Sequence, residues 1–201
     1  ADLANLMNEA AIFAARRGQK TIGQDDLFES VEKVILGPER KSRVISKNEK
    51  EITAYHEGGH ALVAAALYGA DPVHKVSIVS RGFAGGYTMK LPIEDRHLRT
   101  RAQFLTDLAS LLGGFVSEKL TFGDVSTGAS SDLKQASELA RKLVTKYGMS
   151  SLGPVTFGNT EEMIFLGREM TTEKNYSEKV AAAIDKEVHN FIDNAYKTAQ
   201  R

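Results

Sequence analysis

The amino-acid sequence predicts a mainly α-helical fold with one small β-sheet. Through most of the 201 residues, apolar side chains recur at the three- and four-residue spacing of helices, and only two short segments have the pattern of strands. Hydrophobic residues make up 42% of the chain, which is enough for a core. The net charge of zero argues against a generally basic nucleic-acid-binding domain. The absence of cysteine excludes disulfides and thiolate zinc sites, and no apolar run is long enough to span a membrane.

The N-terminal region predicts two helices. The first has an apolar stripe that comprises Leu3, Leu6, Met7, Ala10, Phe13 and Ala14, and Gly18 is its expected stop. The second begins at Asp25-Asp26 and ends at Gly37-Pro38. Its apolar side comprises Leu27, Val31, Val34 and Ile35.

A polar, mostly basic stretch over residues 38–48 follows these helices and is typical of a solvated connector. We therefore expect two regions, residues 1–40 and residues 41–201. The first residue is alanine and already belongs to a helical pattern, so we expect the chain to be a fragment of a longer protein.

The second region predicts two strands among four helices. Alternation predicts strands over residues 73–80 and 85–91, and Pro92 suggests that the second is an edge strand or ends there. The predicted helices, each with an apolar side, cover residues 50–68, 98–120, 131–147 and 172–199. A loop rich in Gly, Ser and Thr precedes the third of these helices, and Ser130 is its expected N-cap.

The motif His56-Glu57-Gly58-Gly59-His60 carries the chemistry of this sequence. Two histidines four residues apart on a helix project from one face, so their imidazoles can bind one zinc ion. Glu57 lies beside the open position of the metal, where it could take a proton from an activated water and pass it to the leaving amine. The flanking residues are mostly apolar, so the helix is expected to be buried, and buried polar side chains need a partner. The motif therefore indicates a zinc metallopeptidase.

The third zinc ligand is left open by the residues themselves. The positions of a nearby third histidine hold Val63 and Ala66, and no acidic residue occurs between Pro72 and Ile93. The more distant acidic candidates are Glu94, Asp95, Asp107, Glu118, Asp124 and Asp132. Glu118 lies on a predicted helix, and Asp132 lies in the first turn of the next one after the glycine-containing loop. Chemistry alone divides the choice between these two.

Four motifs in the chain resemble the FtsH family of AAA-type ATP-dependent zinc proteases. They are Thr53-Ala54-Tyr55-His56-Glu57-Gly58-Gly59-His60-Ala61, Leu111-Leu112-Gly113-Gly114, the segment from Phe122 to Leu133, and Lys146-Tyr147-Gly148-Met149-Ser150. The resemblance implies a helical zinc-peptidase domain over residues 41–201, preceded over residues 1–40 by the C-terminal helices of an AAA lid subdomain and a linker. It also implies that Asp132 is the third zinc ligand, which leaves Glu118 a structural residue or a partner of a ligand.

The same resemblance implies the setting of the activity. The family acts as a homo-hexamer on unfolded or unfoldase-delivered proteins, and its members are anchored in a membrane with this domain on the cytoplasmic or organellar matrix side. The chain has no G-x-x-x-x-G-K-[ST] motif, so we expect no nucleotide binding here and ATP dependence only through the ATPase part of a parent protein. Any link to a membrane would come from segments N-terminal to this chain, and nucleic acid is not an expected partner.

The second predicted strand is a candidate for substrate binding. Residues Gly85, Gly86, Tyr87 and Thr88 are expected to offer a strand edge to an unfolded substrate. Candidates for stabilising the oxyanion are Tyr55, Tyr87 and His97. The alternative function is a ring-assembly module with a structural or inactive metal site. A nucleic-acid-binding helical domain, which would bind less tightly as salt rises, is a weaker hypothesis.

Overall fold

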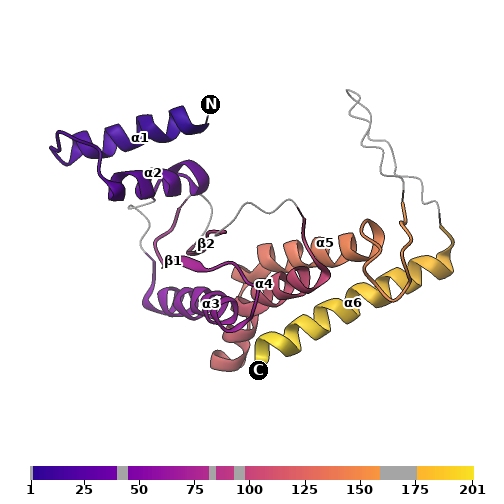
Figure 1. The fold of residues 1–201 in the computed structure, drawn as a ribbon. Coiled ribbons are helices and arrows are strands. Elements are labelled where there is room, and N and C mark those ends of the chain that lie inside the picture. The colour runs from indigo at the N-terminus through magenta and orange to yellow at the C-terminus, as the bar shows by residue number, and fades with distance from the viewer. Residues whose placement is uncertain (1, 40–44, 82–84, 93–97, 159–175) are drawn as a thin grey trace, which may run out of the picture. The chain divides into compact units, whose positions relative to one another are not determined.

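The computed structural model describes residues 2–39, 45–81, 85–92, 98–158 and 176–201, and its elements are labelled in Figure 1. The α-helices are α1 (Asp2–Arg16), α2 (Gln24–Leu36), α3 (Lys47–Ala66), α4 (Arg101–Phe122), α5 (Ser130–Thr145) and α6 (Glu178–Gln200). A short 3₁₀ helix, η1 (Thr127–Ala129), precedes α5. Strands β1 (Val73–Ser77) and β2 (Tyr87–Lys90) form a two-stranded sheet. The mainly helical class with one small sheet is confirmed.

The chain divides into two compact units, and each is described by itself. Unit 1 comprises Ala1–Thr53 and Ser77–Tyr87, and unit 2 comprises Ala54–Val76 and Thr88–Arg201. The backbone passes from unit 1 to unit 2 within α3 and again at the start of β2.

Unit 1 contains the helix pair α1 and α2, which pack against each other. Ala10 and Ala14 of α1 are buried, whereas Leu3, on the predicted apolar stripe, is 80% exposed. The ammonium group of Lys33 in α2 forms an ion pair with Glu9 in α1. The predicted stripe therefore buries only its small residues fully, while Leu6 and Phe13 are half-buried, and a charged contact supplements the apolar packing.

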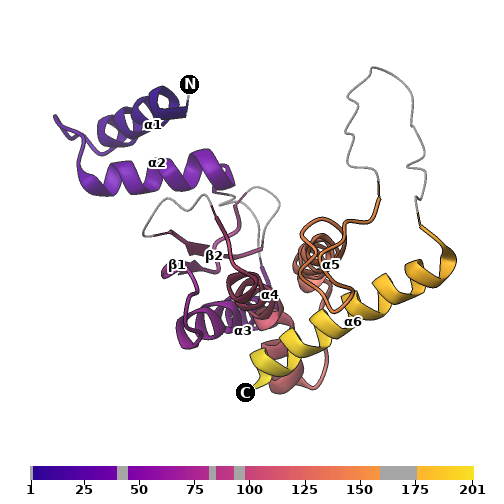
Figure 2. The same ribbon diagram turned by 45° about the vertical axis from the view of Figure 1, so that its right-hand side comes forward.

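Unit 2 has its apolar core where α4, α5 and α6 pack together, as the two views in Figures 1 and 2 show. Leu108, Leu143 and Ile184 come from the three helices in turn, and each is at most 1% exposed. Val63 and Leu67, in and just after α3, pack against the same cluster. The core thereby holds the helix that carries the histidine motif.

Helices α3 and α4 approach each other at two glycines. A Cβ atom added to Gly59 would lie 2.4 Å from the carbonyl oxygen of Gly113, and one added to Gly113 would lie 2.7 Å from that of Gly59. Gly58 has nothing within 4 Å of the same position. Only one of the two glycines in the motif is therefore required by close packing.

The bounds of four predicted elements need correction. Strand β1 ends at Ser77 rather than residue 80, and β2 begins at Tyr87, because Gly85 and Gly86 lie in a bend. Ser130 is the first residue of α5 and not its cap; Ser126 instead caps η1 by accepting the N–H of Gly128. Helix α6 begins at Glu178, with Ser177 as its cap, while the predicted start at residue 172 lies outside the described residues.

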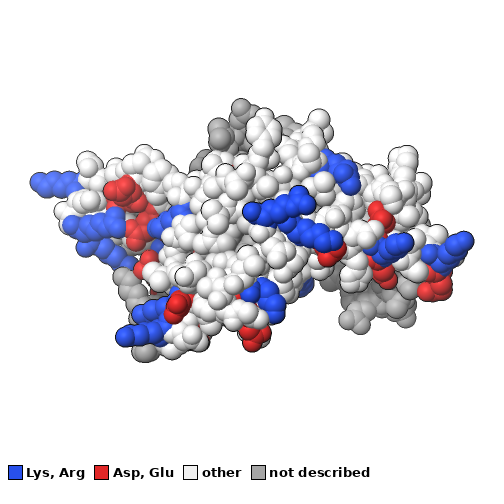
Figure 3. All heavy atoms as spheres, turned by 90° about the horizontal axis from the view of Figure 1, so that it is seen from below, with Lys and Arg blue, Asp and Glu red and all other residues white. Residues whose placement is uncertain are grey.

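The distribution of surface charge and the hydropathy of the helices match the neutral, mixed composition of the chain. On the face drawn in Figure 3, blue basic and red acidic side chains are interspersed. Within the described residues, every helix is too short or too polar to cross a membrane.

Candidate metal centre

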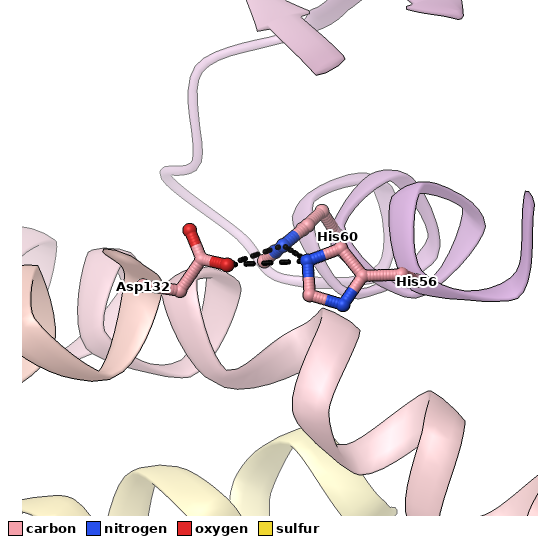
Figure 4. A group of neighbouring side chains, drawn as sticks. All are labelled: His56, His60 and Asp132. Atoms are coloured by element: carbon pink, nitrogen blue, oxygen red, sulfur yellow. Dashed lines mark hydrogen bonds and ion pairs between the residues drawn. The ribbon is translucent and has the colours of Figure 1, made fainter. Parts of the chain in front are cut away.

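Three side chains from two helices converge in unit 2. His56 and His60 project from one face of α3, and Asp132 comes from the first turn of α5 (Figure 4). The His56 Nε2 atom lies 3.1 Å from the Nε2 atom of His60 and 3.1 Å from Asp132 Oδ2. The His60 Nε2 atom lies 3.5 Å from the same carboxylate oxygen. These atoms form a small triangle, as a shared metal ion requires.

The size of this triangle fits zinc. A tetrahedral zinc ion holds nitrogen and oxygen ligands at about 2.0–2.1 Å, which places any two ligand atoms about 3.3 Å apart. The three separations of 3.1, 3.1 and 3.5 Å bracket that value. Both histidine side chains are only 10% exposed, so the ion would lie in a largely dry site.

The opposite nitrogen of each imidazole has a partner that sets its protonation. The Nδ1 atom of His60 lies 2.7 Å from the carbonyl oxygen of Ser110, which can only accept, so Nδ1 carries the proton in the neutral ring. The Nδ1 atom of His56 lies 2.7 Å from Glu118 Oε1, again an acceptor. With both rings in this state, two nitrogen lone pairs and a carboxylate oxygen face one point. That donor set could hold a metal ion.

Glu118 also connects the histidine helix to the loop before Asp132. Its side chain is buried, with 1% of the residue exposed, and its second oxygen accepts the backbone N–H of Ser126. Gly114, one turn earlier on α4, leaves room for the His56 ring, because a Cβ atom there would lie 2.5 Å from the ring. Helix α4 thus orients one histidine through an acid and makes space for it through a glycine.

The electrostatics of the cluster favour an anionic Asp132. Burial opposes its charge, but its interactions with the His56 and His60 side chains outweigh burial and hold the pKa of the Asp132 carboxyl well below its usual range. Burial also opposes a charge on His56, and its interactions with Asp132 and Glu118 raise its pKa overall. Asp132 is therefore in the deprotonated form that metal binding requires.

Glu57 lies next to this cluster in the sequence and is itself buried, with 7% of the residue exposed. Its Oε2 atom accepts a hydrogen bond of 2.8 Å from the hydroxyl of Thr88 on β2. Burial raises the pKa of the Glu57 carboxyl, although the bond from Thr88 acts in the opposite direction. A carboxyl whose pKa is raised above its usual value is suited to exchange protons.

The remaining predicted site residues lie in different surroundings. Tyr55 is 45% exposed, packs edge-on against Phe122, and lines an apolar groove of about 440 Å³ between α3 and α4. The hydroxyl of Tyr87, in unit 1, donates to Glu32 at 3.0 Å. Gly85 and Gly86 precede β2, Thr88 lies within it, and His97 is outside the described residues, as are Glu94 and Asp95.

Two contacts at the metal centre could not be predicted from the sequence. The carbonyl of Ser110 orients His60, but every residue carries a carbonyl, so the side chain at that position gives no indication. Thr88 is predicted only as part of a substrate-binding strand, whereas its hydroxyl contacts Glu57. A pairing between residues 31 positions apart depends on where β2 lies beside α3.

Comparison with known proteins gives long matches. The family model of peptidase family M41 matches residues 43–201. The ATP-dependent zinc metalloprotease FtsH 1 of Sphaerobacter thermophilus is 59% identical over 200 residues, which is 99% of this chain and 31% of that protein. FtsH 1 of Thermomicrobium roseum is 58% identical, and FtsH of Caldicellulosiruptor bescii is 53% identical, each across 100% of this chain. The chain thus spans about a third of the length of these curated relatives.

Proposed function

The chain belongs to peptidase family M41, and from this premise we propose that it hydrolyses peptide bonds as the zinc-dependent part of an ATP-dependent protease. One observation carries the proposal. Two imidazole nitrogens and one carboxylate oxygen lie 3.1–3.5 Å apart with their lone pairs toward a common point, and a buried glutamate adjoins them. This is the donor set and spacing of a zinc site with a neighbouring base.

In this proposal His56, His60 and Asp132 hold the zinc ion, and Glu57 is the general base. Zinc, when bound, lowers the pKa of water and polarises a carbonyl group. Glu57 takes a proton from the water that attacks the peptide carbonyl and passes it to the departing amine. Its Oε2 atom is occupied by Thr88, while Oε1 takes no hydrogen bond from the described residues and is free to receive that proton.

The number of ligands supports a catalytic ion over a structural one. Within the described part of the chain, three side chains and not four form the cluster. Structural zinc sites are normally closed by four protein ligands, whereas catalytic sites keep one position open. A base beside the cluster has no use in a purely structural site.

We also propose that β2 binds the substrate backbone. Among the described strands β2 pairs only with β1, so its other edge is not taken by a strand. The hydroxyl of Thr88 reaches Glu57, which places this part of β2 next to the proposed base. An added substrate strand would be recognised by backbone hydrogen bonds whatever its side chains, as a protease for unfolded chains requires.

The wider setting of the activity is part of the proposal. The named relatives are ATP-dependent and about three times as long as this chain. We infer a membrane-anchored homo-hexameric parent that receives ATP-unfolded proteins, with this domain on the cytoplasmic or organellar matrix side. Residues 1–40 would then be the end of an AAA lid subdomain. Exposed apolar side chains in that region, such as Leu3 at 80% and Ile35 at 64%, support its packing within a larger subdomain.

Zinc content and cleavage of an unfolded peptide, measured on the same preparations, test the function. We expect about one zinc per chain in the wild type. Glu57→Gln should keep the zinc and lose about 10²–10⁴-fold in cleavage rate, the usual contribution of a general base. Asp132→Ala should lose both the zinc ion and the cleavage activity. Glu138→Gln, an exposed change on α5, is the matched control and should alter neither.

Two results would overturn the proposal. One is a wild-type chain that takes up no zinc when zinc is supplied, which would favour a ring-assembly module. The other is a Glu57→Gln variant that cleaves as fast as the wild type.

A further inference from the structure

Thr88 makes two contacts with a single residue. Its Oγ1 atom lies 2.8 Å from Glu57 Oε2 and 3.0 Å from the backbone carbonyl oxygen of Glu57. Both atoms are acceptors when the glutamate is ionised, and a hydroxyl has one proton to give. We propose that Thr88 is a positioning residue that fixes the carboxylate of Glu57 in its orientation beside the metal centre. This proposal rests on the proposed function, in which Glu57 is the base.

Thr88 restricts the orientation of the Glu57 side chain. A free glutamate side chain has several rotatable bonds, and fixing it costs rotamer entropy. Within the described residues, Thr88 is the hydrogen-bond donor to the Glu57 carboxylate. Threonine is branched at Cβ and is therefore stiff about χ1, and β2 holds its backbone. The hydroxyl is thus a rigid anchor for Oε2.

Thr88 also relates the carboxylate to the backbone of the same residue. Its Oγ1 atom lies 2.8 Å from Oε2 and 3.0 Å from the backbone carbonyl oxygen of Glu57. One hydroxyl therefore contacts both ends of the glutamate, and Oε1 is left for the proton that the proposed base accepts.

The register of β2 allows this role. Tyr87 and Met89 are buried, whereas Thr88 and Lys90 are half-buried, which is the alternation of a strand with two different faces. Thr88 is the residue of β2 whose side chain reaches α3 at the motif. A shift of the strand by one residue would replace the hydroxyl with an aromatic or a thioether side chain.

Two substitutions of the zinc-loaded chain separate the hydroxyl from the shape of the side chain. Thr88→Val keeps the shape and loses the hydroxyl, whereas Thr88→Ser keeps the hydroxyl. We expect Thr88→Val to lower kcat for peptide cleavage about 10–100-fold, the effect of losing one hydrogen bond to a charged group. KM should stay within about twofold and zinc content should be unchanged. Thr88→Ser should restore most of kcat.

A second readout does not depend on activity. The NMR signal of the Glu57 carboxyl carbon, assigned by its loss in Glu57→Gln, should move in Thr88→Val and stay near its wild-type position in Thr88→Ser. The prediction holds for zinc-free protein as well.

The outcomes distinguish the role of Thr88 from the proposed peptidase function on which it rests. An active wild type with an equally active Thr88→Val variant, or with Thr88→Ser as impaired as Thr88→Val, would overturn the role of Thr88 alone. Loss of zinc in Thr88→Val would also overturn it, because the residue would then support the metal site rather than the base. A zinc-loaded wild type that cleaves nothing would overturn the proposed function and this inference together.

Discussion

Units 1 and 2 of the chain are stabilised by different kinds of contact. Outside the metal centre the core of unit 2 is apolar, and Leu108, Leu112 and Leu143 in it are at most 2% exposed. In unit 1 the buried residues include charged ones. Arg81 is 4% exposed, and its guanidinium donates to Glu32 at 3.0 Å and to Glu39 at 2.8 Å.

This difference predicts how each unit responds to substitution. Unit 2 depends on volume and on close approach of helices, as in any well-packed core. Unit 1 depends on charges that remain paired, because a buried charge without a partner is costly.

Arg81→Leu should have the largest effect, and it should fall on unit 1. Removal of one partner from a buried ion pair costs about 3–5 kcal/mol. Hydrogen exchange of peptides from α2 should accelerate accordingly, while exchange in α5 changes little. Arg141→Leu is the matched control, because the Arg141–Asp185 pair is more than half exposed and should contribute less than about 1 kcal/mol. Similar effects from both substitutions would remove the distinction between the units.

Gly59→Ala should have an intermediate effect on unit 2. The added Cβ atom would lie 2.4 Å from the Gly113 carbonyl oxygen, so α3 and α4 must separate, at a cost of about 1–3 kcal/mol in the free energy of unfolding. Because His60 follows directly, zinc affinity should fall too.

Gly58→Ala is the control for that prediction and should have the opposite sign. A Cβ atom added at Gly58 would have no other atom within 4 Å, so the substitution should stabilise the helix by up to about 1 kcal/mol. Urea unfolding followed by circular dichroism, together with a zinc titration, compares the pair. Equal destabilisation by both variants would contradict the close crossing of α3 and α4.

Glu187→Gln should have the smallest effect, at the surface of unit 2. The backbone N–H of Ser151 donates to the Glu187 carboxylate at 3.0 Å and lowers its pKa, and Asn190 adds a second bond. A lowered folded-state pKa contributes stability that is fully present above the unfolded value of about 4.3 and disappears as pH falls through the folded value. The site is mostly exposed, so we expect less than about 0.5 kcal/mol at pH 7.

Urea unfolding of wild type and Glu187→Gln at pH 7 and below pH 4 measures this effect. The difference between the two proteins should shrink at the lower pH. A difference that grows on acidification would contradict the assignment.

Much of the fold was predictable because helices are local. Six helical patterns were expected, and six α-helices are described, each with its apolar residues at helical spacing. The boundaries were less predictable. Ser130 has the chemistry of a cap, yet η1 extends the helical conformation backward to Thr127 and leaves the capping role to Ser126. Because Gly85 and Gly86 have no side chains, they add nothing to the alternation pattern, and the start of the strand could not be predicted from it.

The placement of the two histidines follows from the motif alone. An α-helix places residues four apart on one face, so His56 and His60 face one point and Glu57 adjoins it, whatever surrounds the helix. The geometry of one helix depends only on neighbouring residues, and for that reason it can be obtained from a motif.

The arrangement of the carboxylates depends on how the helices pack. Glu118 and Asp132 lie 62 and 76 residues beyond His56, and both reach the same imidazole from opposite sides. Asp132 meets Nε2, where it also faces His60, whereas Glu118 meets Nδ1. Which acid meets which nitrogen depends on how α4 and α5 pack around α3. That packing results from side-chain contacts spread over three helices, and no spacing along the chain encodes it.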